Sequence, residues 1–282
     1  SVTVPSNVTV CNGVTIPVSN FTSTTPGSTF AWTNSDPSVG LAASGTGSIP
    51  SFSGTNNSAN PVTTTVTVTP TASGCPGTPA SYNITVNPTP VVFVPANITV
   101  CNSATVAASN FTSTTPGTTF SWTNSNTTIG LAANGTGNTP SFTGINNTAL
   151  PVTTTVTVTP TANGCPGTPA SYTITINPGP NVVVPTNSTI CNGATIAVSN
   201  FTSTTPGVTF TWTNSDASIG LTASGTGNTP SFTGTNNTAL SVSATITVTP
   251  SASGCPGTPA SYTITINPTP IVVIPANIAV CN

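Results

Sequence analysis

Apolar and polar side chains alternate along several short stretches of the chain, and this alternation predicts β-strands. Residues 62–69 read VTTTVTVT, and residues 81–86 read SYNITV. A period of two places one face of a strand against a core and the other face in water. No stretch shows the 3.6-residue period of a helix, and Leu, Glu, Lys and Arg are scarce or absent, so we expect an all-β fold.

Two further segments complete the predicted strand pattern. Residues 29–33 place Phe30 and Trp32 on one face of a strand. Residues 7–10 and 14–18 flank the tripeptide Cys-Asn-Gly. Because an Asn-Gly pair between two alternating segments favours a tight turn, we expect these two segments to form a β-hairpin.

The whole pattern recurs along the chain. The spacing between successive cysteines alternates between 64 and 26 residues, which gives a period of 90, and the block GCPGTPASY occurs three times unchanged. We therefore expect three units, residues 1–88, 89–178 and 179–268, with residues 269–282 as the first strand of a truncated fourth. Since the chain begins without Met, we expect it to be a fragment of a longer protein.

The size and strand content of one unit predict its fold. About seven short strands in a unit of this length, with a Trp in mid-strand, are typical of an immunoglobulin-like Greek-key β-sandwich. We expect such sandwiches in a linear array, joined by short Pro-rich links such as NPTP at residues 87–90. The predicted core aromatic residues are Trp32, Trp122, Trp212, Tyr82, Tyr172 and Tyr262.

The charge of the chain excludes several classes of function. There is no Lys, Arg or His, so nothing can neutralise the phosphates of a nucleic acid. The longest apolar runs have about four residues, far fewer than the roughly 20 that a membrane-spanning helix needs. General acid–base, Schiff-base and phosphoryl-transfer chemistry lack their usual side chains. We expect no catalytic residue, no cofactor and no metal site.

The two acidic residues do not change that expectation. Asp36 and Asp216 occupy equivalent positions in the first and third units, and Asn126 stands at this position in the second. A catalytic acid there would have no base in its own unit. We interpret both Asp residues as turn residues that hydrogen-bond to the nearby backbone.

The cysteines indicate disulfides formed in an oxidising compartment. Pairing within units is the simpler arrangement and the one we favour. It joins Cys11 to Cys75, Cys101 to Cys165 and Cys191 to Cys255, and leaves Cys281 to pair outside the fragment. In a sandwich with an odd number of strands, however, the first and last turns lie at opposite ends. Disulfides between neighbouring units, Cys11 to Cys165 and Cys101 to Cys255, therefore remain the alternative.

These motifs resemble those of a known family. The chain is similar to the PKD-like and immunoglobulin-like repeats of very large secreted bacterial surface proteins, of the gliding-motility adhesin type exported by type IX secretion. The resemblance rests on VCN at residues 10–12, FAWTNS at 30–35, the doublet GC at 74–75 and SYNITVNPTP from Ser81, with counterparts in the later units. It implies display at the cell surface, tandem arrays, and roles in adhesion or filaments. The acidic residues usual in calcium-binding arrays are missing, so the resemblance does not imply calcium at the joints.

The leading functional hypothesis is a disulfide-stabilised, non-catalytic structural segment of an extracellular filament or adhesin stalk. Its expected partners are like units or like chains, and a terminal strand of one unit could complete the next by strand addition. The alternative is a module that binds surface glycans through its polar Thr and Asn faces. Contact with ice or minerals through Thr ladders such as Thr65, Thr67 and Thr69 is a special case of that alternative.

Overall fold

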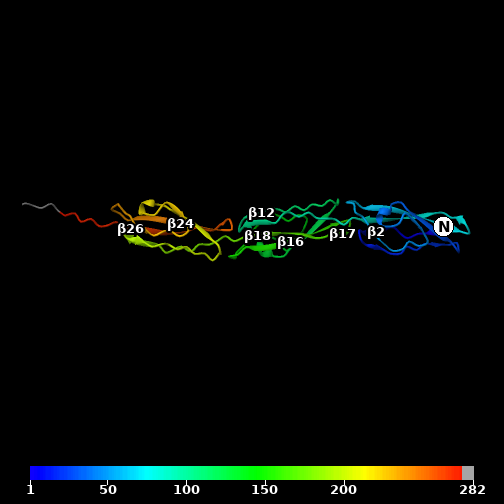
Figure 1. Ribbon diagram of the computed structural model, residues 1–282, viewed down its shortest axis with the longest axis horizontal. Coiled ribbons are helices and arrows are strands. Elements are labelled where there is room, and N and C mark those ends of the chain that lie inside the picture. The colour runs from blue at the N-terminus through cyan, green and yellow to red at the C-terminus, as the bar shows by residue number, and fades with distance from the viewer. Residues whose placement is uncertain (275–282) are drawn as a thin grey trace, which may run out of the picture.

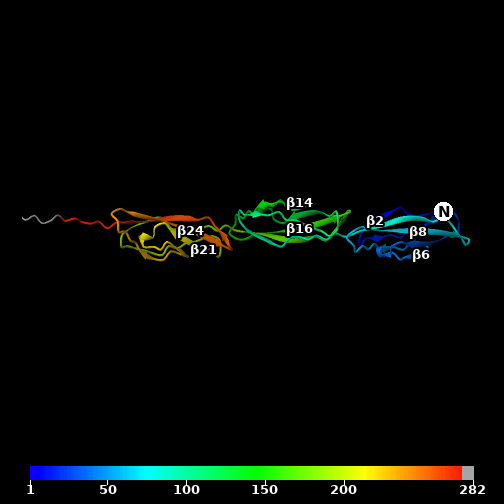
Figure 2. The same cartoon turned by 90° about the horizontal axis from the view of Figure 1, so that it is seen from above.

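A computed structural model describes residues 1–274 of the chain. Within that part, the only helices are three short 3₁₀ turns, and everything else regular is β-structure. None of those helices has the length and apolar content needed to cross a membrane. Three β-sandwiches follow one another along a line, so the molecule is a thin rod (Figures 1 and 2). The predicted all-β fold, with immunoglobulin-like sandwiches in tandem, is confirmed.

The three repeats share eight strands in the same order, and the first also has β1 and β4, whose counterparts in the later repeats are single bridges. The elements of the first repeat are β1 (Val2–Thr3), β2 (Val8–Cys11), β3 (Thr15–Ile16), β4 (Thr22–Ser23), β5 (Thr29–Asn34), η1 (Pro37–Val39), β6 (Ser44–Thr46), β7 (Phe52–Ser53), β8 (Val62–Ala72), β9 (Cys75–Pro76) and β10 (Ala80–Asn87). Those of the second are β11 (Ile98–Cys101), β12 (Thr105–Val106), β13 (Thr119–Asn124), η2 (Thr127–Ile129), β14 (Asn134–Thr136), β15 (Phe142–Thr143), β16 (Val152–Ala162), β17 (Cys165–Pro166) and β18 (Ala170–Asn177). Those of the third are β19 (Ser188–Cys191), β20 (Thr195–Ile196), β21 (Thr209–Asn214), η3 (Ala217–Ile219), β22 (Ser224–Thr226), β23 (Phe232–Thr233), β24 (Val242–Ala252), β25 (Cys255–Pro256) and β26 (Ala260–Asn267).

One layer of the first repeat is a sheet with the strand order β2-β10-β8-β5-β6, and the short β9 pairs antiparallel with the end of β8. The other layer consists of the short pairs β1–β4 and β3–β7. β10 and β8 are antiparallel, whereas β2 runs parallel to β10, with Val8 opposite Ile84. Because β2 is parallel to the last strand of the repeat, it ends where the chain leaves that repeat.

The predicted hairpin at the first turn is wrong. β2 pairs with β10 in one sheet, and β3 pairs with β7 in the other. The turn at Asn12 and Gly13 therefore carries the chain from one layer to the other. Gly13 has a φ of 84°, and the Val14 N–H donates to the Cys11 carbonyl over 3.1 Å. The Asn-Gly signal marked the turn correctly, but it could not say which strands the turn connects.

The core of each repeat lies between the two layers. In the first repeat Val66, Val68, Ile84 and Val86 are fully buried, as the alternating pattern of β8 and β10 requires. Trp32 is 5% exposed and lies across the glycine of β6, where a Cβ on Gly45 would be 2.3 Å from the indole Cζ2. A ring that large fits only because its neighbour on the adjacent strand has no side chain.

Candidate functional site

The joints between repeats are the places where the cysteines gather, so they form the candidate site. Cys11 ends β2 and lies at the end of the repeat from which the chain exits, which we call the C-terminal pole. Cys75 follows β8 and lies at the opposite end, which we call the N-terminal pole. The N-terminal pole of one repeat faces the C-terminal pole of the repeat before it (Figure 1).

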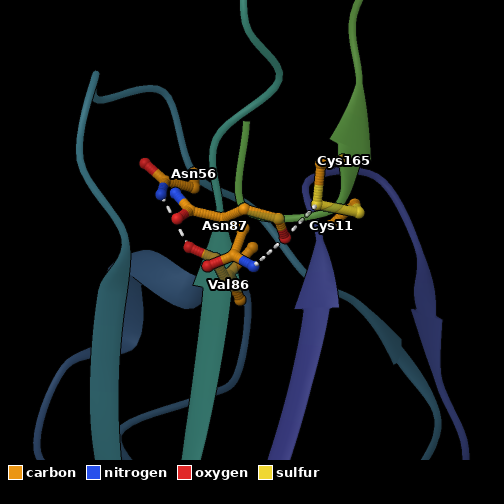
Figure 3. Close-up of a disulfide and its surroundings, with 6 residues drawn as sticks. Cys11, Asn56, Val86, Asn87 and Cys165 are labelled. Carbon is orange, nitrogen blue, oxygen red and sulfur yellow. Dashed lines mark hydrogen bonds between the residues drawn. A yellow bond between two sulfur atoms is a disulfide. The ribbon is translucent and has the colours of Figure 1, made fainter. Parts of the chain in front are cut away.

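Two disulfides cross these joints. Cys11 bonds Cys165 and Cys101 bonds Cys255, with Cα–Cα distances of 5.6 and 5.5 Å. Figure 3 shows Cys11 at the end of its strand in the first repeat, meeting Cys165 in the second. The within-repeat pairing that we favoured is therefore wrong, because its two partners lie at opposite poles of one sandwich. In the structure, both disulfides join neighbouring repeats.

The remaining cysteines have no bond within the described part of the chain. Cys75 lies at the N-terminal pole of the first repeat, and Cys191 lies at the C-terminal pole of the third. Both are exposed and unbonded. Cys281, which we expect to pair outside the fragment, lies outside the described residues.

Each joint is also closed by the Pro-rich link, which packs against a glycine of the next repeat. Pro88 and Pro90 are buried. A Cβ on Gly167 would lie 1.9 Å from the Pro90 carbonyl oxygen, and one on Gly257 would lie 1.7 Å from that of Pro180. Only glycine permits so close an approach of backbone to backbone.

Asparagine side chains make hydrogen bonds within the C-terminal pole and across the joint. The Asn56 amide donates to the Val86 carbonyl over 2.7 Å (Figure 3). The Asn12 side chain accepts from the Asn56 N–H over 2.9 Å. Asn87 donates to the Asn163 carbonyl of the second repeat over 3.1 Å. These bonds keep the last strand and the first turn together, so that Cys11 points at the next repeat.

Burial shows that the joint is a packed interface. Ala162 and Cys165 are each 1% exposed at the first joint, and Thr115 is 5% exposed. Their counterparts in the first repeat, where nothing precedes the N-terminal pole in the structure, are more open: Cys75 and Thr25 are exposed. The neighbouring repeat, rather than the repeat's own core, therefore buries these side chains.

A shallow polar groove lies beside each joint. At the first joint a hollow of about 400 Å³ is lined by Asn12, Asn56, Asn57, Ser58, Ala59, Thr89, Val91, Thr114 and Thr115. The equivalent hollow at the second joint measures about 330 Å³. Its lining offers amides and hydroxyls but no charged side chain. Residues 1–274 contain no group of three or more His, Cys, Asp or Glu side chains that could hold a metal ion.

The aromatic residues singled out from the sequence lie inside the sandwiches. Trp32, Trp122 and Trp212 are 5%, 4% and 3% exposed, and Tyr82, Tyr172 and Tyr262 are 3%, 2% and 3% exposed. Burial raises the pKa of Tyr82. Rings buried in this way offer no stacking platform to a sugar.

The two acidic residues cap the short 3₁₀ turns. The Asp36 carboxylate accepts from the Ser38 N–H over 2.9 Å at the start of η1, and Asp216 accepts from Ser218 at the same distance. The hydrogen bonds from Ser38 lower the pKa of Asp36. Asn126 accepts from Thr128 over 3.0 Å in the second repeat. The turn role that we expected is confirmed.

Sequence reasoning missed Gly167, Gly257 and the asparagines of the poles. One signal for the asparagines was present, because an Asn-Asn pair recurs at residues 56–57, 146–147 and 236–237. For the glycines no signal existed. Gly77, Gly167 and Gly257 share the same block, GCPGTPASY, and only the packing of a preceding repeat separates the last two from the first.

The chain can be compared with solved structures. It is similar to immunoglobulin domains 1–5 of Sidekick-1, with 12% identity and a TM-score of 0.36, over 95% of this chain and 59% of that one. It is also similar to protocadherin gamma B2 extracellular cadherin domains 3–6, with 13% identity and a TM-score of 0.39, over 96% and 76%. For mouse cadherin-23 EC22–24 the identity is 11% and the TM-score 0.34, over 94% and 97%.

A comparison by sequence is more specific. No curated protein matches the chain. The profile of the PKD-like domain matches three times, at residues 8–90, 98–180 and 188–270, and these matches cover most of the chain. Each matched segment contains one complete six-stranded sheet of the structure. This chain therefore belongs to the PKD-like domain family, with three copies of the domain in tandem.

Proposed function

We propose that this chain is a rigid, non-catalytic segment of an extracellular stalk or filament at a bacterial cell surface. The observation that carries the proposal is that two covalent links cross each joint. At the first joint these are the peptide link through residues 87–91 and the disulfide between Cys11 and Cys165. A single linker acts as a hinge, whereas two attachment points at one interface restrict bending and twisting.

The same disulfides shorten the covalent route along the rod. From Cys11 the route crosses to Cys165 and follows 26 residues to Cys191, and it bypasses residues 12–164. Those 26 residues include β18 and β19, which are already extended. At about 3.3–3.6 Å per residue they reach at most roughly 90 Å. Tension between Cys11 and Cys191 would therefore meet a nearly taut covalent path before it could unravel the bypassed repeats.

Chemistry and composition support a place outside the cell. Disulfides persist in oxidising compartments and are rare in the cytosol. The absence of Lys and Arg removes every cleavage site for trypsin-like proteases, and the absence of Met removes a common target of oxidation. Antibody labelling of intact producing cells, without permeabilisation, tests this location. Labelling that requires broken cells would contradict it.

The stiffness of the joints can be tested within one molecule. The double variant Cys11→Ser and Cys165→Ser removes the disulfide of the first joint and leaves that of the second. We expect electron micrographs to show a broader distribution of bend angles at the first joint only. The variant Cys75→Ser, which removes an unbonded thiol, is the matched control and should leave both joints straight. Equal bending at both joints in all three proteins would contradict the proposal.

A further inference from the structure

The tight turn between β16 and β17 differs from its counterparts in one residue. In the second repeat this turn is Asn163-Gly164, whereas in the first and third repeats it begins with a serine, Ser73 or Ser253. Asn163 and Gly164 have φ angles of 50° and 77°, and β16 and β17 pair directly on either side of them. This is the type I′ hairpin turn, which an Asn-Gly pair favours.

The turn lies at the first joint. The residue that follows it, Cys165, bonds Cys11 of the first repeat. The Asn163 backbone carbonyl accepts from the Asn87 side chain across the joint over 3.1 Å. The equivalent hydrogen bond at the second joint ends on Ser253. A change in the covalent path of this turn would therefore act on two bonds that cross the first joint.

An asparagine followed by glycine carries a specific reactivity. The backbone nitrogen of the glycine attacks the side-chain carbonyl carbon of the asparagine, ammonia leaves, and a cyclic succinimide forms. Water then opens the ring to give aspartate or isoaspartate. The net reaction consumes water and releases ammonia, and nothing is oxidised or reduced. Glycine permits the attack because it has no Cβ to obstruct the approach.

The chain has four such pairs, at residues 12–13, 134–135, 163–164 and 192–193. In the first and last of them both reacting groups are already bonded. The side-chain oxygens of Asn12 and Asn192 each accept from a backbone N–H over 2.9 Å. The N–H groups of Gly13 and Gly193 each donate to a backbone carbonyl over 2.8 Å. Both turns would have to open before they could react.

The pair at residues 134–135 is restrained in another way. Asn134 is exposed, but it belongs to β14, and Gly135 pairs with Trp122 on β13. The attack requires the backbone to fold back toward the asparagine side chain. A paired, extended strand opposes that movement, so this site also needs local unfolding.

The turn at residues 163–164 has neither restraint. Both of its residues are exposed, and a Cβ on Gly164 would meet nothing within 4 Å. The hydrogen bond that Asn163 makes across the joint uses its backbone carbonyl, so its side chain stays in solvent. The Gly164 N–H has no backbone acceptor in the described part of the chain. An exposed turn opens at a lower free energy than a paired strand does.

We propose that Asn163 is a site of spontaneous deamidation, modified before the other three Asn-Gly pairs, and that its modification loosens the first joint alone. Isoaspartate carries the main chain through the former side chain, which adds a methylene group to a turn of two residues. The longer turn no longer matches the ladder of β16 and β17, and it displaces both Cys165 and the acceptor of Asn87. The second joint has Ser253 at this position and cannot react.

The test of the site keeps the full chain, with its two native disulfides, at mildly alkaline pH. Samples are digested with pepsin in acid, which suppresses further reaction, and mass spectrometry measures aspartate and isoaspartate at each Asn-Gly pair. We expect Asn163 to convert at least about tenfold faster than the other three, because only they need a bonded or paired segment to open. In the reduced, unfolded chain all four should convert at similar rates.

The test of the joint compares fresh and aged protein. We expect dithiothreitol to reduce the disulfide of Cys11 and Cys165 faster after ageing, and the disulfide of Cys101 and Cys255 at an unchanged rate. The variant Asn163→Ser copies the other two repeats and should show no effect of ageing. Asn163→Asp adds the charge without the methylene group, so it should behave like fresh protein.

The results that would overturn the inference are specific. Conversion of any other Asn-Gly pair as fast as Asn163 in the folded protein would refute the choice of site. Equal acceleration of both disulfides, no acceleration, or the same acceleration in fresh Asn163→Asp would refute the effect on the joint. The inference goes beyond the proposed function, since bend angles are measured on fresh molecules. A stiff rod that shows no deamidation at Asn163 would contradict the inference and leave the proposed function standing.

Discussion

At the scale of single residues, amides and hydroxyls take the place that charged groups have in most proteins. Asn56 binds the Val86 carbonyl at the C-terminal pole, and Asn34 binds the Leu41 carbonyl inside the sandwich over 2.8 Å. The side chain at the start of each 3₁₀ turn is Asp36, Asn126 or Asp216, and all three accept the same backbone hydrogen bond. The turn thus requires an acceptor, not a negative charge.

This equivalence predicts a nearly flat dependence of stability on pH. The pKa of Asp36 and that of Asp216 are lowered in the folded protein, so their contribution is present at neutral pH and is lost as the pH falls through these pKa values. We expect a constant melting temperature between about pH 5 and 8 and a small decrease below about pH 4.

The double variant Asp36→Asn and Asp216→Asn copies the second repeat at both positions. It should melt like the unchanged protein at neutral pH and lose the decrease at low pH. Calorimetry across this range checks both expectations. A large loss of stability at neutral pH would show that the charge itself matters.

The Trp cores depend on one glycine each. In Gly45→Ala the new Cβ would collide with the Trp32 indole, 2.3 Å from Cζ2, on a strand whose pairing fixes the distance. We expect a loss of about 1–3 kcal/mol in the stability of the first repeat, as for other overpacked cores. Urea unfolding followed by Trp fluorescence measures it. Ser44→Ala, at an exposed neighbour in β6, is the control; equal effects of the two changes would refute the packing argument.

At the scale of elements, alternation in the sequence was a good guide to strands. The stretch 62–69 lies within β8, and 81–86 lies within β10, because each strand is buried on one face only. The pairing of the short strands could not be predicted from the sequence in the same way. β2 and β3 carry few alternating positions, and the turn between them switches layers, which no local pattern encodes.

The link between repeats is the element whose packing is most restricted. Gly167→Ala should push the link away from the second repeat, because its Cβ would lie 1.9 Å from the Pro90 oxygen. We expect dithiothreitol to reduce the disulfide of Cys11 and Cys165 faster in this variant, since the loosened joint exposes it.

The second joint is the control within the same molecule. Its disulfide, Cys101 to Cys255, should be reduced at an unchanged rate in Gly167→Ala. Gly179→Ala should alter neither rate, because its Cβ would make only an ordinary contact with the Asn102 side chain, 3.8 Å from Nδ2. Mass spectrometry of alkylated thiols follows each disulfide separately. Equal acceleration of both disulfides would indicate global destabilisation instead of a local effect at the joint.

At the scale of the whole molecule, the period of 90 residues was enough to predict a linear array of like domains. It was not enough to decide the pairing of cysteines. That decision depends on which pole each cysteine occupies, and the pole depends on β2 running parallel to β10. The cysteine spacing is compatible with both arrangements, and only the three-dimensional path of the chain separates them.

The joint disulfides also explain why an almost uncharged chain can remain a defined rod. Nearly identical repeats with exposed strand edges are prone to exchange strands with the wrong partner. A staple between each repeat and the next fixes the order of neighbours once it has formed. The polar surface of Thr, Ser and Asn then interacts with water without help from charge.

The central claim is that the disulfides join neighbouring repeats, and a peptide map under non-reducing conditions tests it most directly. The freshly prepared protein is blocked at free thiols, denatured and digested with chymotrypsin, because trypsin has no site in the chain. We predict two cross-linked species, Cys11 with Cys165 and Cys101 with Cys255, and alkylated Cys75 and Cys191. Cross-links of Cys11 with Cys75 and of Cys101 with Cys165 would contradict the account.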